Sequence, residues 1–135
     1  MSTKTGFLLL NKPPHITSFA CINHIKKIIQ EKIKIGHAGT LDPFATGLLI
    51  IAIGRQATRN IRYLSTLDKE YIAKAKLGEL RNTFDCTGSV TQTMQTTGIT
   101  EKNLRQAIYS LGSSYKQVPP IYSALKHQGT PLYKL

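Results

Sequence analysis

Apolar residues gather in short runs that predict strands at three places along the chain. The run Gly6–Asn11 predicts a strand, which ends where a lysine and two consecutive prolines follow. A second run, Leu48–Ile53, contains only apolar residues and predicts a buried strand. In the stretch Glu70–Leu77, apolar and polar residues alternate, which is typical of a strand with one buried face.

Other stretches carry the helical spacing of apolar residues, or a polar cap followed by helix-forming residues. These predict helices from a cap at Thr17 or Ser18 to about Gln30, from Ala57 to Leu64, and from Glu101 to Leu111 behind a Thr100 cap. The mixture of strands and helices lacks strict strand–helix repetition and therefore favours an α+β fold.

The remaining segments give weaker signals. Residues 78–98 are polar and turn-rich, and they are long for a plain loop, which suggests a segment that faces a substrate. Near the end of the chain we expect short strands at Tyr115–Val118 and Tyr122–Lys126, and the start of a helix at Pro131–Leu135.

The segment Gly36–Gly47 holds one carboxylate, Asp42, among three glycines and a proline. The nearest acidic residues along the chain are Glu31 and Asp68. Glycine and proline favour turns over regular strand pairing here. An Asp-Pro pair is also a good helix start, because Asp caps free N–H groups and Pro fits the first helical position. We therefore expect a loop, with a helix start at Asp42, that presents this carboxylate beside the strand that follows.

The net charge of the chain favours some classes of binding partner over others. The chain has 135 residues, 18 Lys and Arg against 7 Asp and Glu, and a net charge of +11. Its hydrophobic content of 41% allows a packed core, and its length allows one domain. Such a charge favours a nucleic acid, although a merely soluble basic protein is the plain alternative. An anionic membrane is a weaker rival, because no basic amphipathic helix is evident.

Cysteine usage and the amino terminus indicate where the protein works. Cys21 and Cys86 form no CxxC pair and no disulfide framework, which fits a reducing cytoplasm. Cys21 and His24 have metal-like spacing, but a zinc site needs a second pair that the sequence lacks. The apolar stretch near the start is too short for a signal sequence or a membrane span. We expect a cytoplasmic protein without metal or membrane association.

The residues around Asp42 leave several chemical roles open. The carboxylate could cap a helix, bind a metal, act as a general base or act as a nucleophile. A hard cation needs several oxygen ligands, and hydrolysis by paired carboxylates needs a second acid; neither is near in sequence. Capping is the ordinary role, and an unpaired nucleophile is the sharpest chemical one.

Four ordered motifs resemble the TruB-type tRNA pseudouridine synthases. The string from Gly36 to Gly47 resembles the family's aspartate motif, and the resemblance extends from about Phe7 to Tyr133. The other matching strings are Leu9-Leu10-Asn11-Lys12-Pro13-Pro14-His15-Ile16-Thr17-Ser18, then Lys69-Glu70-Tyr71 with Thr83-Phe84-Asp85-Cys86-Thr87-Gly88, and Pro119-Pro120-Ile121-Tyr122-Ser123-Ala124-Leu125-Lys126. The chain departs from the family at Asn11, where Asp is frequent, and at His15, where Gly is frequent.

The resemblance implies roles for two catalytic residues. Asp42 would initiate cleavage of the glycosidic bond of a uridine, whose base then rotates and rejoins the ribose through carbon 5. Tyr71 would stack on the flipped base, because an extruded pyrimidine needs a π-face to replace its neighbours. Without the resemblance, a tyrosine on an alternating strand is more often a core residue.

Further residues would contact the substrate or support the pocket. The resemblance places His37, Gly39 and Thr40 in the RNA-contact surface, and it gives Lys12 the pocket floor or a phosphate contact. Asp85 would pair with an arginine of a later motif, which does not occur before Leu135. The plain alternatives are a locally hydrogen-bonded His37, a solvated Lys12 and an Asx turn at Asp85.

These observations predict a pseudouridine-synthase-like α+β fold with a mixed, largely antiparallel sheet flanked by helices. Residues 1–135 would form a single partial catalytic domain, incomplete at the carboxyl end and without a carboxyl-terminal RNA-binding domain. The implied activity is cofactor-free isomerisation of uridine in the T-loop of tRNA, by a monomer whose partner is the tRNA T-arm. A non-catalytic tRNA-binding or remodelling module, and a guide-RNA-dependent archaeal or eukaryotic relative, remain as alternatives.

Overall fold

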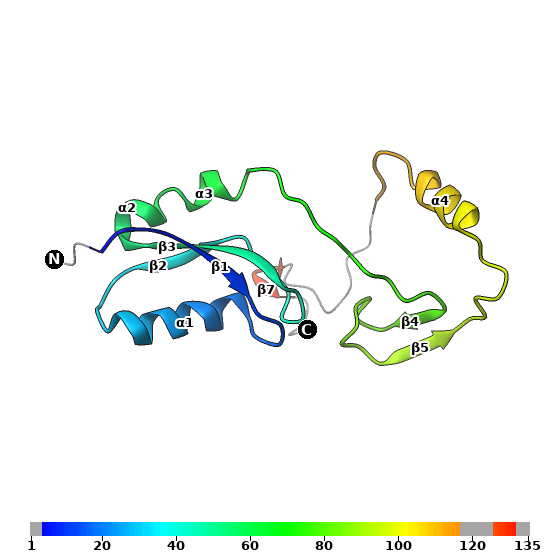
Figure 1. Ribbon diagram of the computed structural model, residues 1–135, viewed down its shortest axis with the longest axis horizontal. Coiled ribbons are helices and arrows are strands. Elements are labelled where there is room, and N and C mark those ends of the chain that lie inside the picture. Colours follow the sequence, from blue (N-terminus) through cyan, green and yellow to red (C-terminus); the bar gives the residue numbers. More distant parts are fainter. Residues whose placement is uncertain (1–3, 117–125, 132–135) are drawn as a thin grey trace. The chain divides into compact units, whose positions relative to one another are not determined.

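The computed structural model describes residues 4–116 and 126–131, and its contacts divide the chain into two compact units. The units are Met1–Ile72 and Ala73–Leu135, and we describe each by itself (Figure 1). Compact units of this kind can belong to one catalytic domain or to two, so the single catalytic domain stays a prediction.

A three-stranded antiparallel sheet forms the centre of the first unit. Its strands are β1 (Gly6–Lys12), β2 (Ile35–Ala38) and β3 (Gly47–Ile53), in the order β1-β3-β2. The two strands predicted from apolar runs are confirmed. The expectation that residues 36–38 belong to a loop is wrong, because they pair with β3. A four-residue strand that contains glycine gives little local signal, and its hydrogen bonds come from a distant partner.

Helix α1 (Ser18–Ile29) packs on one face of this sheet and confirms the first predicted helix. The Thr17 side chain caps it by accepting a hydrogen bond of 3.0 Å from the Ala20 N–H. The core of the unit lies between helix and sheet and consists of Cys21, Ile22, Ile25, Leu49 and Ile51. Burying each large aliphatic side chain stabilises the fold by roughly 1.5–3 kcal/mol.

Two short helices, α2 (Gly54–Thr58) and α3 (Ile61–Leu64), replace the single helix predicted for residues 57–64. The Asn60 side chain explains the interruption, because its amide donates to the Gln56 carbonyl while the Asn60 N–H donates to Ala57. A Cβ atom at Gly36 would lie 2.6 Å from Ile61 Cδ1, so glycine lets α3 approach β2 closely. Figure 1 shows α2 and α3 on the side of the sheet opposite α1.

The second unit contains the hairpin strands β4 (Glu79–Arg81) and β5 (Val90–Thr93), and helix α4 (Glu101–Ser110). A Thr100–Asn103 capping box starts α4, which confirms that prediction. The turn-rich segment 78–98 is therefore organised as a hairpin. None of the residues described from Ala73 to Lys116 is buried.

Two predictions for the later part of the chain are wrong. The alternating stretch Glu70–Leu77 forms no strand, since none of the described strands pairs with it and its side chains are exposed. The helix expected from Pro131 is also wrong at its first residue, because β7 (Thr130–Pro131) pairs with β6 (Lys126–His127). The strands predicted at 115–118 and 122–126 fall largely on residues 117–125, outside the described residues.

Candidate active site at the Asp42 loop

The loop between β2 and β3 carries Asp42 and is bounded by two glycines with positive φ. Gly39 has a φ of +96° and Gly47 has a φ of +124°, conformations that other residues rarely adopt. Within the loop, the Ala45 N–H donates to the Asp42 carbonyl at 3.0 Å and closes a turn with Pro43 at its second position. The predicted helix start is wrong, because the chain reverses here into β3. The predicted turn geometry is confirmed.

Lys12 is fully buried beneath this loop, with 0% of its surface exposed. Its ammonium group donates to the Pro13 and Ile16 carbonyls at 2.8 Å and to the Pro43 carbonyl at 3.1 Å. These three acceptors match the three donors of an ammonium group. The solvated-lysine alternative is therefore wrong, and no ammonium proton remains for a phosphate.

Three more hydrogen bonds, made by His15 and Ser18, fix the loop backbone on either side of Asp42. The His15 N–H donates to the Pro43 carbonyl at 2.7 Å. The Ser18 hydroxyl accepts from the Leu41 N–H at 3.0 Å and donates to the Leu41 carbonyl at 3.2 Å. The residue before Asp42 is thus bonded to the first residue of α1, and the residue after it is bonded to the segment that joins β1 to α1.

The Asp42 carboxylate is exposed and has no hydrogen bond or ion pair with any residue in the described part of the chain. The capping alternative is therefore wrong for this side chain. Within residues 4–116 and 126–131, no group of three or more His, Cys, Asp or Glu side chains could hold a metal ion. Both carboxylate oxygens are therefore open to a ligand or substrate.

His37 lies on β2 directly opposite Ile51, and Lys12 lies on β1 opposite Gly47. Directly opposed residues of antiparallel strands share a face, so both belong to the face that packs against α1. The buried Nδ1 atom of His37 has no hydrogen-bond partner among the described residues. The alternative of a locally hydrogen-bonded histidine is thus unsupported at this nitrogen.

The other predicted residues are distributed differently. Thr40 is exposed within the Asp42 loop, next to Gly39. Tyr71 is 70% exposed, and the described residues offer it no hydrogen bond to the loop. The alternative that Tyr71 is a core residue is therefore wrong.

Asp85 belongs to the second unit, where its carboxylate forms an Asx turn. It accepts hydrogen bonds from the Thr83 and Thr87 hydroxyls at 2.7 and 2.6 Å and from the Thr87 N–H at 2.8 Å. Burial, the largest single influence, raises the pKa of Asp85, but the hydrogen bonds from Thr87 and Thr83 together outweigh it and lower that pKa.

Basic side chains are far more numerous than the acids that could neutralise them. Among the described residues the acids in ion pairs are Glu31, Glu79 and Glu101, which bind Lys4, Lys76, Arg81 and Arg105. Many of the other cations are exposed on α1, α2, α3 and the segment before β2: Lys26, Lys27, Lys32, Lys34, Arg55, Arg59 and Arg62. The first unit therefore exposes cations on helices at both sides of its sheet, and this excess of positive charge attracts a polyanion.

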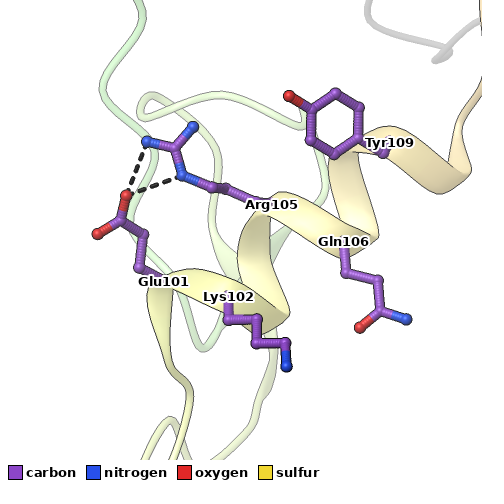
Figure 2. A pocket seen from close by; sticks show the side chains of 5 residues that line it. All are labelled: Glu101, Lys102, Arg105, Gln106 and Tyr109. Carbon is purple, nitrogen blue, oxygen red and sulfur yellow. Dashed lines mark hydrogen bonds and ion pairs between the residues drawn. The ribbon is translucent and has the colours of Figure 1, made fainter.

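A surface recess in the second unit is unrelated to these residues. Figure 2 shows that side chains of α4 line it, with an ion pair of 2.7 Å between Arg105 and Glu101. None of the residues predicted for the site lies in it. No helix in the described part of the chain is long and apolar enough to cross a membrane.

Comparison with known families matches residues 26–135 to the TruB family pseudouridylate synthase (N terminal domain). The chain belongs to this family. It is 44% identical to the tRNA pseudouridine synthase B of Thermotoga petrophila over 132 residues, which cover 98% of this chain and 42% of the relative. It is also 44% identical to that of Desulfotalea psychrophila, over 95% of this chain and 52% of the relative.

This TruB family chain thus spans about half the length, or less, of these curated relatives. One solved structure, an H/ACA RNP bound to a substrate RNA containing 2'-deoxyuridine, contains a chain with 43% identity to it. The match covers 43% of this chain and 18% of that chain, with a TM-score of 0.40. The resemblance found in the sequence motifs is confirmed by the family match, and the antiparallel α+β fold is confirmed by the structure.

The sequence pointed to Asp42 and Lys12, but it did not show that Ser18, at the start of α1, binds the Asp42 loop. From the sequence, Thr17 and Ser18 were interchangeable caps, whereas Thr17 caps α1 and Ser18 binds Leu41. A helix start needs only one side-chain cap. A second hydroxyl residue next to the cap is therefore a signal that its side chain can bind another segment.

Proposed function

We propose that this chain carries the catalytic aspartate of a tRNA pseudouridine synthase, which isomerises uridine to pseudouridine in the T-loop. The observation that carries the proposal is the exposed, unpartnered Asp42 carboxylate on a loop whose backbone is bonded on both sides. A group held this way loses little freedom when it reacts, which is what nucleophilic catalysis requires.

In the proposed reaction, Asp42 attacks the uridine at either the ribose or the base and so brings about cleavage of the bond from C1' to N1. The base rotates, C5 bonds to C1', and the bond between Asp42 and the nucleotide breaks. C5 then loses its proton and N1, freed from the ribose, gains one. Atoms balance without a cofactor, because the product is an isomer of the substrate. The carboxylate is regenerated and can act again.

The surrounding residues would hold the flipped nucleotide. Tyr71, exposed and without a hydrogen bond to the loop, would stack on the uracil ring. His37 would donate or accept a hydrogen bond to the RNA beside the loop, where Gly39 and Thr40 approach the backbone. Asp85, which lies in the second unit, would pair with an arginine, as the resemblance to the family implies. Lys12 would act by positioning Pro43, since its protons are already used.

The tRNA substrate is supported by charge and by the cost of base flipping. A net charge of +11 favours RNA through counterion release. Extruding a uridine from a loop costs less than extruding it from a duplex, because fewer stacking and pairing interactions are lost. A monomer that works in the cytoplasm on the T-arm completes the proposal.

Replacing Asp42 by Asn in the complete gene product tests the proposal. The amide keeps the size of the side chain but is a poor nucleophile, so product should fall by more than about a thousandfold. Affinity for tRNA should stay within about threefold, because binding rests on other residues. Asp68→Asn is the matched control, since Asp68 is an exposed acid outside the site.

The outcomes separate the alternatives. Product from D42N at the D68N rate would overturn the assignment of Asp42. Tight tRNA binding without product from the wild-type protein would favour a non-catalytic binding module. Product that appears only with an added guide RNA would favour the guide-dependent relative.

A further inference from the structure

Ser18 forms an unusual pair of hydrogen bonds with one residue of the Asp42 loop. It is the first residue of α1 and only 2% exposed. Its hydroxyl accepts from the Leu41 N–H and donates to the Leu41 carbonyl, at 3.0 and 3.2 Å. One side chain thus satisfies both backbone polar groups of the residue directly before Asp42.

The neighbouring residue shows that this is not ordinary helix capping. Thr17 is the cap, and its hydroxyl accepts from the Ala20 N–H inside the same helix. Within the described part of the chain, the Ser18 side chain makes no hydrogen bond inside α1; both of its bonds reach a segment 23 residues away. The helix therefore forms without the Ser18 hydroxyl, and the loop is what this hydroxyl serves.

The contacts on the two sides of Asp42 are divided between different residues. Lys12 and the His15 N–H hold the carbonyl of Pro43, which follows Asp42. Ser18 holds Leu41, which precedes it. With both neighbours fixed, little backbone freedom remains for the residue between them.

We infer that Ser18 is a positioning residue, which fixes the backbone before Asp42 and so sets where the carboxylate meets its substrate. This inference rests on the proposed function of Asp42. A displacement of about 1 Å at a reacting group can cost a hundredfold in rate. Loss of the hydroxyl should therefore reduce the rate of the chemical step more than it reduces tRNA affinity.

Two variants test this in the complete gene product, with a third as the control. Ser18→Ala removes both hydrogen bonds, and Ser18→Cys keeps a side chain of similar size with only weak hydrogen bonding. Thr17→Ala is the matched control, because it removes a hydroxyl from the adjacent residue without touching Leu41. Single-turnover rates at saturating tRNA, tRNA dissociation constants and exchange of the Leu41 amide hydrogen are measured for all of them.

We expect S18A to lower the single-turnover rate about 10- to 100-fold relative to T17A, with tRNA affinity within about threefold. The Leu41 amide should exchange faster in S18A and S18C than in T17A or the wild type. Equal rates for S18A and T17A, or unchanged Leu41 exchange in both Ser18 variants, would overturn the inference. If the wild-type protein forms no pseudouridine, the proposed function fails by itself, and the exchange data still decide whether Ser18 holds Leu41.

Discussion

The Asp42 loop and the segment around Tyr71 differ sharply in how the protein holds them. The loop lacks helix and strand, yet its backbone is bonded at Leu41 to the start of α1, and at Pro43 to the end of β1 and the segment that follows it. The residues from Glu70 to Lys76 are also irregular, but they are exposed and unpaired with any described strand. Absence of regular secondary structure therefore does not mean the same thing at the two places.

The comparison suggests two ways of preparing a functional side chain. The fold itself places Asp42, and the free energy for doing so comes from buried hydrogen bonds and a glycine at each end of the loop. Tyr71 has no such support among the described residues, so the position that it takes in a complex depends on what it contacts there. Mutations of the residues that hold the Asp42 loop should consequently affect the stability of the protein. Mutations of Tyr71 should affect only tRNA binding or the reaction rate.

The largest effect on stability should come from Lys12→Met. Methionine fills much of the same space but leaves the carbonyls of Pro13 and Ile16 without their buried donor. We expect a loss of about 2 kcal/mol in the free energy of unfolding, since relief from burying a charge offsets part of the lost bonding. Denaturant titration measures it, with exposed Lys27→Met as a control that should stay within about 0.5 kcal/mol. Equal behaviour of the two variants would show that the loop is not held by Lys12.

Tyr71 should give the opposite pattern. Tyr71→Ala removes an exposed ring, so the free energy of unfolding should change by less than about 0.5 kcal/mol. The proposed stacking predicts a fall in kcat/KM of about 10- to 100-fold, while Tyr71→Phe keeps the ring and most of the binding. Steady-state kinetics with tRNA and thermal unfolding of both variants measure this. A Tyr71→Ala protein that is strongly destabilised would show that the fold itself depends on this ring.

A smaller, stabilising effect should come from His15. This residue has a φ of 67°, in the left-handed region, while its N–H donates to Pro43. His15→Gly relieves strain of about 1–2 kcal/mol and adds freedom to the unfolded chain, so a net gain of about 0.5–1 kcal/mol is expected. The bond to Pro43 is retained because it uses the backbone. A loss of stability in calorimetry would show that the His15 side chain contributes contacts of its own.

The sequence was informative where the signal is local. Long apolar runs and polar caps gave β1, α1, β3 and α4 with nearly their observed bounds, since each depends on neighbouring residues. β2 was missed because a four-residue strand gains its stability from β3, and Glu70–Leu77 was mistaken for a strand because alternation does not supply a pairing partner.

In the candidate site, too, some features could be predicted from the local sequence and others depend on the fold. Asp42 could be singled out as an isolated acid in a turn-rich segment, and glycines at the loop ends were readable from the sequence. The hydrogen bond from Lys12 to Pro43 joins residues 31 positions apart, and the two bonds between Ser18 and Leu41 join residues 23 positions apart. Contacts between such distant residues depend on the fold. The left-handed conformation of His15 is also imposed by the fold, because a non-glycine side chain rarely adopts a positive φ by itself.

We propose above all that the unpartnered carboxylate of Asp42 performs the chemistry. The most direct test of this proposal is a single-turnover measurement of pseudouridine formation in tRNA by the wild-type, D42N and D68N proteins at saturating enzyme. We expect product with the wild type and D68N and none with D42N, although all three bind tRNA comparably. Product from D42N at the wild-type rate would contradict it.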